Sequence, residues 1–392
     1  MAIDKFWNLV YCLFVVCSFI FIPNVKSEWL NPKEAVLLLG SFFLISSSFY
    51  FLRFREFKNM WVTLILFFVI ISFGIAFYVP MIFTDSGGKV LWNVWNYYQT
   101  LQVLSGFFLI KILFDYTDSV ARWVILTKVL CWMAFIFALY GIFQYFGAEQ
   151  IFNEEHGWYV KVDKRLGYPE NPRMTAFLGN NFFLGNYLSV LSPFCLIFKE
   201  LRYKIFYIII WIALILTKSF LAVFVGFIGL VTYLLLTKKF KWIVVVCLLA
   251  STFCLFKFNK NHKFFNNNGR TGLIELAVVE WKKNPIWGGG IGSFEKAGYM
   301  AGHKRVDNVH NEFVQLLPEG GIILFGLVMG YLITLFKRII YTSSNILSIG
   351  FLSSFIGYLF VCLGGFPLHL ASMALIGIFL ITFLELHTHL QV

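Results

Sequence analysis

Charged residues are scarce in this chain: only 13% of its 392 residues are Asp, Glu, Lys or Arg, whereas 59% are hydrophobic. A water-soluble domain cannot bury so much apolar surface in one core, so lipid must be the solvent for much of the chain. The excess of 32 Lys and Arg over 20 Asp and Glu would suggest nucleic acid in a soluble protein. Basic residues kept on the cytoplasmic side of a bilayer explain it better, and no nucleic-acid-binding pattern is present.

The chain also lacks the short motifs that mark many catalytic and metal sites. Its seven cysteines all fall inside apolar runs and none forms a CxxC pair, so we interpret them as small buried hydrophobic residues. No Walker A, GxSxG or HExxH motif occurs. No carboxylates with DxD-like spacing stand at an expected outer membrane boundary, so neither a metal nor another cofactor is predicted. The first apolar run lacks a convincing cleavage site and is interpreted as a span.

Apolar runs long enough to cross about 30 Å of hydrocarbon recur along the chain. They predict an all-α, polytopic membrane bundle of about twelve transmembrane helices, at residues 7–23, 34–52, 61–83, 90–114, 123–146, 182–198, 205–216, 221–236, 242–256, 322–336, 346–363 and 367–384. Two interpretations of residues 205–236 stay open. They form either a helical hairpin that turns at Thr217, Lys218 and Ser219 or one long bent element.

Lys and Arg in the short loops orient these spans. Basic residues at 53–58, 199–204, 238–241 and 337–338 alternate to one side, which the positive-inside rule makes cytoplasmic. An even number of spans then places both termini in the cytoplasm. The predicted organisation is spans one to five at 1–146, an outer loop at 147–181, spans six to nine at 182–256, a large outer loop at 257–317 and spans ten to twelve at 318–392.

The loop 257–317 is the longest polar interruption in the chain. Loops of this length are usually functional or disordered. Apolar residues between 273 and 281 recur near helical spacing and stop before Asn284 and Pro285. This pattern predicts either an amphipathic helix that lies at the membrane interface or a helix that caps the bundle. Positive charge is normally kept off the outer side, so the basic residues of this loop indicate an anionic ligand.

The residues suited to chemistry lie at the expected outer boundary. His310 precedes span ten, where a neutral imidazole could accept a proton from a hydroxyl nucleophile, or could only bond backbone or lipid headgroups. Arg173 lies at the entrance to span six and Arg270 opens the expected helix. A guanidinium grips phosphate in a bidentate fork, although an interfacial Arg often only contacts headgroups. Lys304 and Arg305 would attract anionic groups weakly.

Glycine and proline residues lie close to His310 in the sequence, on both sides of it. Pro318, Gly320 and Gly321 predict a helix break or a close backbone approach at membrane depth. The run Gly288–Gly290 predicts a tight loop. It is not a dinucleotide fingerprint, because no strand precedes it and no βαβ pattern surrounds it.

A resemblance to the O-antigen ligase/polymerase family is carried by RTGLIELAVVEWKKNPIWGGGIGSF, followed by VHNEFVQLLPEGG. The shared pattern is an Arg, a Trp-containing helix, a Pro before a Gly-rich turn, then His-Asn and Glu-Gly. The upstream run RMTAFLGNNFFLGNYL is similar to the family's second arginine motif. One departure concerns a middle span, which often opens with Thr-x-Ser-Arg in the family. This chain has Phe220 at the Arg position, and Lys218 cannot reproduce a bidentate fork.

The resemblance implies a GT-C-like glycosyltransferase in a bacterial inner membrane. The lack of paired carboxylates and a single in-line displacement make the expected enzyme metal-independent and inverting. Such an enzyme moves a glycan from undecaprenyl pyrophosphate to a sugar hydroxyl at the periplasmic face. The acceptor would be a lipid A core in a ligase, which we favour, or a lipid-linked repeat unit in a polymerase. By this resemblance His310 is the general base, and Arg173 and Arg270 are catalytic and bind pyrophosphate. Substrate binding would also involve Lys304, Arg305, Asn311 and Glu319.

Two other classes of function stay open at this stage. A transporter or flippase for lipid-linked glycans would also use many spans and an Arg-lined cavity. Such a protein usually has two similar halves and a ligand site near the midplane, and the sequence shows no convincing internal repeat. A passive scaffold in a cell-envelope complex is the third interpretation, which the arginines and His310 do not require.

Overall fold

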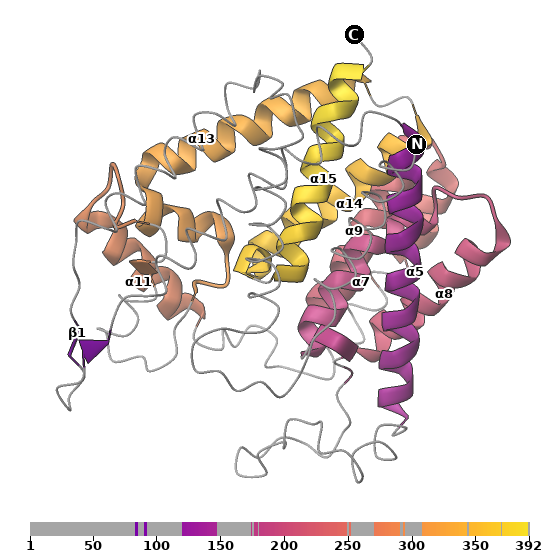
Figure 1. Ribbon diagram of the computed structural model, residues 1–392, viewed down its shortest axis with the longest axis horizontal. Helices are drawn as coiled ribbons and strands as arrows, with labels where there is room; N and C mark the ends of the chain where they lie inside the picture. The colour runs from indigo at the N-terminus through magenta and orange to yellow at the C-terminus, as the bar shows by residue number, and fades with distance from the viewer. Residues whose placement is uncertain are drawn as a thin grey trace, which may run out of the picture. The chain divides into compact units, whose positions relative to one another are not determined.

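The computed structural model describes residues 83–84, 90–91, 120–146, 174, 176–178, 180–248, 251, 270–290, 293–294, 308–342, 345–369 and 371–390 (Figure 1). Internal contacts divide the chain into two compact units. The first contains residues 1–40, 117–254 and 344–361, and the second contains residues 41–116, 255–343 and 362–392. The predicted spans at 7–23 and 34–52 lie outside the described residues.

Helices dominate both units, as predicted. Their bounds are α5 Val120–Tyr145, α7 Asn181–Cys195, α8 Leu201–Leu216, α9 Phe220–Leu236, α11 Arg270–Lys283, α13 Glu312–Thr342, α14 Ile346–Gly364 and α15 Ala371–Leu390, with the short 3-10 helices η2 Ala176–Leu178 and η4 Pro367–His369. Residues 240–248 are also helical. Within this described part, α5, residues 312–339 of α13, and α14 are long and apolar enough to cross a membrane.

One small sheet departs from the all-α prediction. Strand β1, Phe83–Thr84, pairs antiparallel with β2, Val90–Leu91. The sequence analysis assigned Phe83 and Val90 to the ends of two transmembrane helices, and that assignment was wrong at these positions. The reason lies in the intervening residues 85–89, DSGGK, which favour a hairpin over a helix end. The predicted count of about twelve spans is not tested by the described residues.

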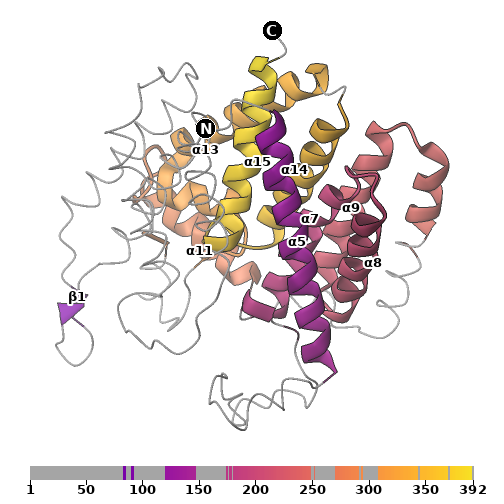
Figure 2. The ribbon, with the colours of Figure 1, turned by 45° about the vertical axis from the view of Figure 1, so that its right-hand side comes forward.

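Among the described helices of the first unit, α7 is the most buried. Its residues from Leu184 to Cys195 are all buried, and Figures 1 and 2 show α5, α8 and α9 beside it. Small residues allow the close approach that helix packing in lipid requires. A Cβ placed on Gly185 would lie 2.6 Å from the Cβ of Ala222 in α9. Phe194 also packs against Phe351 of α14, with ring centroids 4.8 Å apart.

Residues 205–236 form the predicted hairpin rather than one bent element. Helix α8 ends at Leu216 and α9 begins at Phe220. Lys218 adopts a left-handed φ of 57° in the turn between them. Ser219 caps α9, because its side chain accepts a hydrogen bond from the amide of Ala222. Phe220 therefore starts a helix where the family's Arg was expected.

Helix ends that were predicted to share one side of the membrane contact one another. At the predicted outer ends of the first unit, Asn181 Nδ2 donates to the Thr217 carbonyl at 2.9 Å. At the predicted cytoplasmic ends, Lys128 Nζ lies 3.5 Å from Glu200 Oε1. In the second unit, Arg338 near the end of α13 pairs with Glu385 in α15, and both lie at predicted cytoplasmic ends. The up-and-down order derived from the loop charges stays a prediction.

Candidate functional site

Helix α11 of the second unit is held by a small apolar cluster. Ala277 of the helix packs with Phe294 from the loop that follows and with Val309, each no more than 1% exposed. Leu276 and Val314 complete the cluster. A helix therefore forms where the apolar spacing predicted one. Its partner is the segment that enters α13, which supports the capping interpretation for this face.

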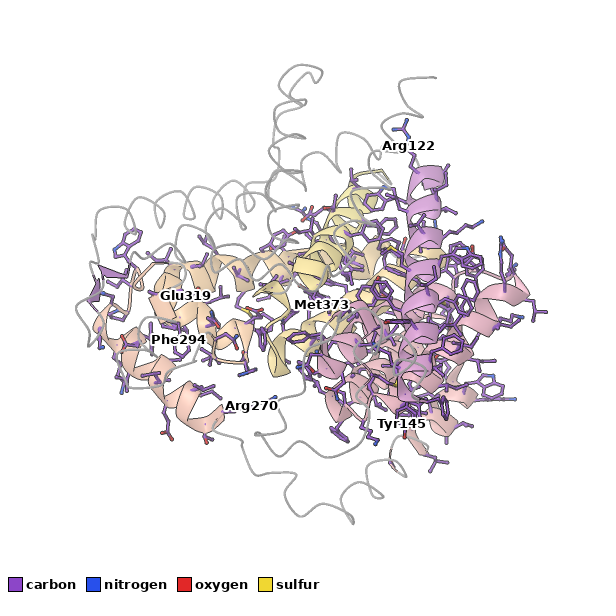
Figure 3. All side chains as sticks on the ribbon, turned by 60° about the horizontal axis from the view of Figure 1, so that its bottom comes forward. Arg122, Tyr145, Arg270, Phe294, Glu319 and Met373 are labelled. Atoms are coloured by element: carbon purple, nitrogen blue, oxygen red, sulfur yellow. The ribbon has the colours of Figure 1, made fainter. Side chains whose placement is uncertain are left out.

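Other side chains of α11 remain exposed. Ile274 and Val279 are 39% and 53% exposed. Arg270, the first residue of the helix, is exposed as well (Figure 3). That part of α11 lies at a membrane interface stays a prediction.

The Gly-rich loop, residues 284–290, forms backbone hydrogen bonds with α13 at the point where that helix is interrupted. The backbone of Gly321 has φ 63° and ψ −168°, so the helix is interrupted there as predicted. The break separates the carbonyls of Pro318 and Glu319 from the amides of Ile322 and Ile323, which a continuous helix would pair.

The Gly-rich loop supplies a new partner for each of these four groups. Amides of the loop donate to the two carbonyls, from Gly289 to Pro318 at 2.8 Å and from Gly290 to Glu319 at 2.9 Å. Carbonyls of the loop accept from the two amides, Pro285 from Ile322 at 3.0 Å and Ile286 from Ile323 at 3.4 Å. A buried peptide group without a partner is costly in lipid, so loop and break stabilise one another.

Two glycines make this backbone approach possible. Gly288 has φ 69°, and a Cβ there would lie 2.5 Å from the carbonyl carbon of Glu319. Gly321 also has positive φ, and a Cβ on it would overlap the carbonyl oxygen of Ile286. No other residue type combines this backbone conformation with this absence of side-chain volume.

His310 lies at the entrance to α13 in an uncommon backbone conformation. Its φ is 57°, which costs a non-glycine residue roughly 1–2 kcal/mol. The amide of His310 donates to Asn308 Oδ1 at 3.2 Å. The imidazole is partly buried and stands nearly perpendicular to the ring of Phe366, with centroids 4.8 Å apart. Such strain in a non-glycine residue is common at functional sites.

The next two residues bind the loop between α14 and α15. Asn311 Oδ1 accepts from the amide of Val314 at 3.1 Å and so caps α13, while its Nδ2 donates to the Leu363 carbonyl at 3.0 Å. Glu312 is buried, and its Oε1 accepts from the amide of Leu368 at 2.7 Å. Together with Phe366, these bonds place residues 363–368 beside His310. The sequence analysis treated that segment only as a short connection.

A buried polar link joins the His310 turn to the break in α13. Gln315 Oε1 accepts from the amide of Val309 at 3.1 Å, and Gln315 Nε2 donates to Glu319 Oε1 at 3.0 Å. Gln315 and Glu319 are 3% and 7% exposed. The Glu319 carbonyl binds the Gly-rich loop, so one chain of hydrogen bonds runs from Val309 to that loop.

Arg270 shares a helical face with the residue that contacts the His310 turn. It precedes Ala277 by seven residues, which places both on the same side of α11. The rise of an α-helix separates them by about 10 Å along the axis. Because Ala277 packs on Val309, the helical spacing places Arg270 at the exposed end of the face that is turned toward the His310 segment.

The remaining predicted residues fall outside the described part of the chain. They are Arg173, Lys304 and Arg305. Of the predicted set, the structure brings His310, Asn311 and Glu319 into one hydrogen-bonded region and places Arg270 on the helix that packs against it. Among described residues, no three His, Cys, Asp or Glu side chains form a group that could hold a metal ion.

Comparison with protein families identifies this region. Residues 205–329 match Wzy_C, the O-antigen ligase family model. The matched segment covers 125 of 392 residues, about a third of the chain. It contains the hairpin of α8 and α9, helix α11, the Gly-rich loop, His310 and the break in α13. The predicted resemblance is therefore confirmed over this segment, and no curated protein matches the chain.

The Wzy_C segment ends at 329, before residues 363–368. Phe366, Gln315 and Phe294 were all missed by sequence reasoning. Phe294 is one of several large apolar residues in the stretch after α11, together with Ile286 and Trp287, and the sequence does not mark it as the buried one. The run Gly364, Gly365, Phe366 and Pro367 carries turn chemistry between two spans. Nothing in the sequence pairs that run with His310.

Proposed function

We propose that this chain is a metal-independent, inverting glycosyltransferase at the periplasmic face of a bacterial inner membrane. It transfers a glycan from undecaprenyl pyrophosphate to a sugar hydroxyl. The match to O-antigen ligases over residues 205–329 and the candidate membrane helices support this assignment. We favour a lipid A core as acceptor, which makes the chain an O-antigen ligase. A lipid-linked repeat unit as acceptor would make it a polymerase that uses the same chemistry.

The single observation that carries the proposal is the backbone conformation and the surroundings of His310. The residue has a left-handed backbone, lies at the start of a broken apolar helix and contacts Phe366, while the preceding Val309 packs with Ala277 and Phe294. A histidine that merely contacted lipid headgroups would need none of this. A general base must instead be held within hydrogen-bond reach of one particular hydroxyl.

The reaction proceeds by one in-line displacement at the anomeric carbon. The acceptor hydroxyl oxygen forms the new bond to this carbon as the bond from carbon to the phosphate oxygen breaks. The hydroxyl proton passes to the imidazole of His310, and undecaprenyl pyrophosphate leaves with the electron pair. General base catalysis of this kind contributes on the order of 10²–10⁴ in rate.

Arginine side chains neutralise the leaving group in this scheme. Arg270 of α11 and Arg173, which precedes the predicted span six in the sequence, are assigned to this role. Each charge-assisted hydrogen bond is worth roughly 1.5–3 kcal/mol, and more where it meets charge that grows in the transition state. Lys304 and Arg305 add weaker attraction for the diphosphate. The internal bonds of Asn311 and Glu319 suit them to shaping the site.

The test is turnover by the purified full-length chain in lipid nanodiscs. The substrates are a defined undecaprenyl-pyrophosphate glycan and, in parallel, a lipid A core and a second lipid-linked glycan, with products identified by mass spectrometry. We expect inverted product on one acceptor. His310→Ala should lower turnover by about 10²–10⁴ with donor binding retained. Arg270→Ala should abolish transfer, and Arg270→Lys should restore only part of it.

Controls separate this proposal from its alternatives. Glu275→Gln changes another exposed residue of α11 and should leave turnover unchanged. Activity should persist in EDTA, and a strict requirement for added Mg²⁺ or Mn²⁺ would contradict the metal-free scheme. Movement of the intact lipid-linked glycan across the bilayer without any new glycosidic bond would instead indicate a transporter.

A further inference from the structure

Gln315 is a buried polar residue inside the run VHNEFVQLLPEGG, but it is not among the residues that define the family pattern. It lies one turn into α13 and bonds in two directions, to the amide of Val309 and to the carboxyl of Glu319. An apolar side chain would fill this position in a helix that simply packed. Burial of a polar group is unfavourable unless it is hydrogen-bonded, so the link reflects a requirement other than packing.

The two ends of the link are the two irregular points of this region. At one end, Val309 is the residue immediately before His310 and its left-handed backbone. At the other end, Glu319 immediately precedes Gly320 and the interruption of α13. The carbonyl of Glu319 also accepts from Gly290. A displacement of the Gly-rich loop would therefore be transmitted through Gln315 to the His310 turn.

We propose that Gln315 and Glu319 are positioning residues that hold the His310 turn at a fixed position relative to the Gly-rich loop. This inference rests on the proposed function, because it assigns the held imidazole to proton transfer. The amide of Gln315 suits the task because it accepts from backbone on one side and donates to a carboxyl on the other. A side chain with only one of these capacities cannot satisfy both ends.

The donor and acceptor order of the link gives a specific test. Gln315→Glu keeps the acceptor for Val309 but sets two carboxyls against each other. Glu319→Gln keeps an acceptor for the Gln315 amide. The exchange variant Q315E/E319Q restores every bond of the link, because a carboxylate at 315 accepts from both Val309 and an amide at 319.

We expect Q315E to lower kcat by about 10- to 100-fold, the effect of a small misplacement of a catalytic group. KM should change by no more than about twofold, because the contacts to substrate remain. E319Q should have a small effect, and the exchange variant should recover most of the lost kcat. Hydrogen exchange of the peptide that contains residues 308–312 should be faster in Q315E and return to its original rate in the exchange variant.

Glu385→Gln is the matched control. It alters a buried carboxyl that is linked to the other end of α13 through Arg338. We expect lower thermal stability with kcat unchanged. A role of Gln315 in stability alone would give Q315E the same phenotype, and that result would overturn the proposal. Normal kcat in Q315E, or an exchange variant as slow as Q315E, would overturn it too.

Failure of the proposed function is recognised separately. Full turnover by His310→Ala would remove the general base, whatever Gln315 does. The link is then judged by hydrogen exchange alone, and unchanged exchange in Q315E would overturn it. If His310→Ala loses turnover and Q315E keeps normal turnover, the proposed function stands. Only the positioning role of Gln315 is then overturned.

Discussion

Helix α7 in the first unit and the first part of α13 in the second each contain a proline, yet they are held in different ways. Pro193 lies two residues before the end of α7, where the neighbouring side chains are all buried. Pro318 lies just before the break in α13, where backbone groups of the Gly-rich loop replace the missing helical bonds. One helix is stabilised mainly by packing, and the other mainly by directional hydrogen bonds.

This difference separates a scaffold from a site. Packing of apolar side chains has no fixed direction, so similar residues can replace one another at a cost of less than about 1.5 kcal/mol when volume is kept. Hydrogen bonds between a loop and a broken helix need each backbone atom in place. The second arrangement can hold a catalytic group in one orientation, but it tolerates few substitutions.

The largest effect is expected at the break in α13. Gly321→Ala would place a methyl group against the Ile286 carbonyl at a positive φ. The Gly-rich loop could then not form its hydrogen bonds with the break in α13. Turnover should fall by about 100-fold or more, because His310 is no longer held in its catalytic position. Turnover per folded molecule in the nanodisc assay measures this.

Gly326→Ala provides the comparison on the same helix. A Cβ there meets no atom within 4 Å, so turnover should stay normal and helix stability should rise by up to about 1 kcal/mol. Similar turnover in both alanine variants would show that the break does not organise the site.

A smaller effect is expected in the packed unit. Gly185→Ala would place a Cβ 2.6 Å from that of Ala222, which should destabilise the bundle by about 1–3 kcal/mol through overpacking. The folded fraction should keep its normal kcat. Gly357→Ala, whose Cβ would meet Val225 at an ordinary 3.4 Å, is the control. Loss of kcat in Gly185→Ala without loss of stability would contradict the view that the first unit serves only as a scaffold.

The smallest effect is expected at the exposed ion pair of the first unit. A hydrogen bond from Arg202 lowers the pKa of Glu200. A lowered folded-state pKa stabilises the protein above the unfolded-state pKa, and this contribution is lost as pH falls through the folded-state value. Glu200→Gln should remove only this weak acid-dependent slope from thermal unfolding, and salt should suppress it. A large change in melting temperature at neutral pH would contradict this expectation.

Much of the second unit could be anticipated from particular residues. The spacing of apolar residues predicted α11, and Pro318, Gly320 and Gly321 predicted the break in α13. Thr217 to Ser219 predicted one possible turn, and the hairpin of α8 and α9 resolved that alternative. These predictions succeed because helix propensity, proline and glycine act on their own neighbourhood. The short β hairpin was missed because DSGGK was judged only as a gap between apolar runs.

The pairing of distant segments could not be anticipated in the same way. Asn311 was predicted to bind substrate, which stays a prediction; its side chain caps α13 and donates to the Leu363 carbonyl. Glu319 was assigned to the substrate too, and its carboxyl accepts from Gln315. An exposed ligand contact and an internal bond demand the same polar residue types, so composition alone does not distinguish them.

By itself the sequence indicated apolar helices suited to a membrane, predicted that they alternate in direction, and placed an Arg, a His and a glycine-rich run in a segment that matches the O-antigen ligase family. Those properties follow from hydropathy, charge placement and local backbone preference. Only the tertiary structure decided that residues 284–290 bind the interruption in α13 and that residues 363–368 lie beside His310. In these contacts, backbone groups that a helix leaves without a partner form hydrogen bonds with segments distant in sequence. A local sequence pattern does not specify which distant segment supplies the partner.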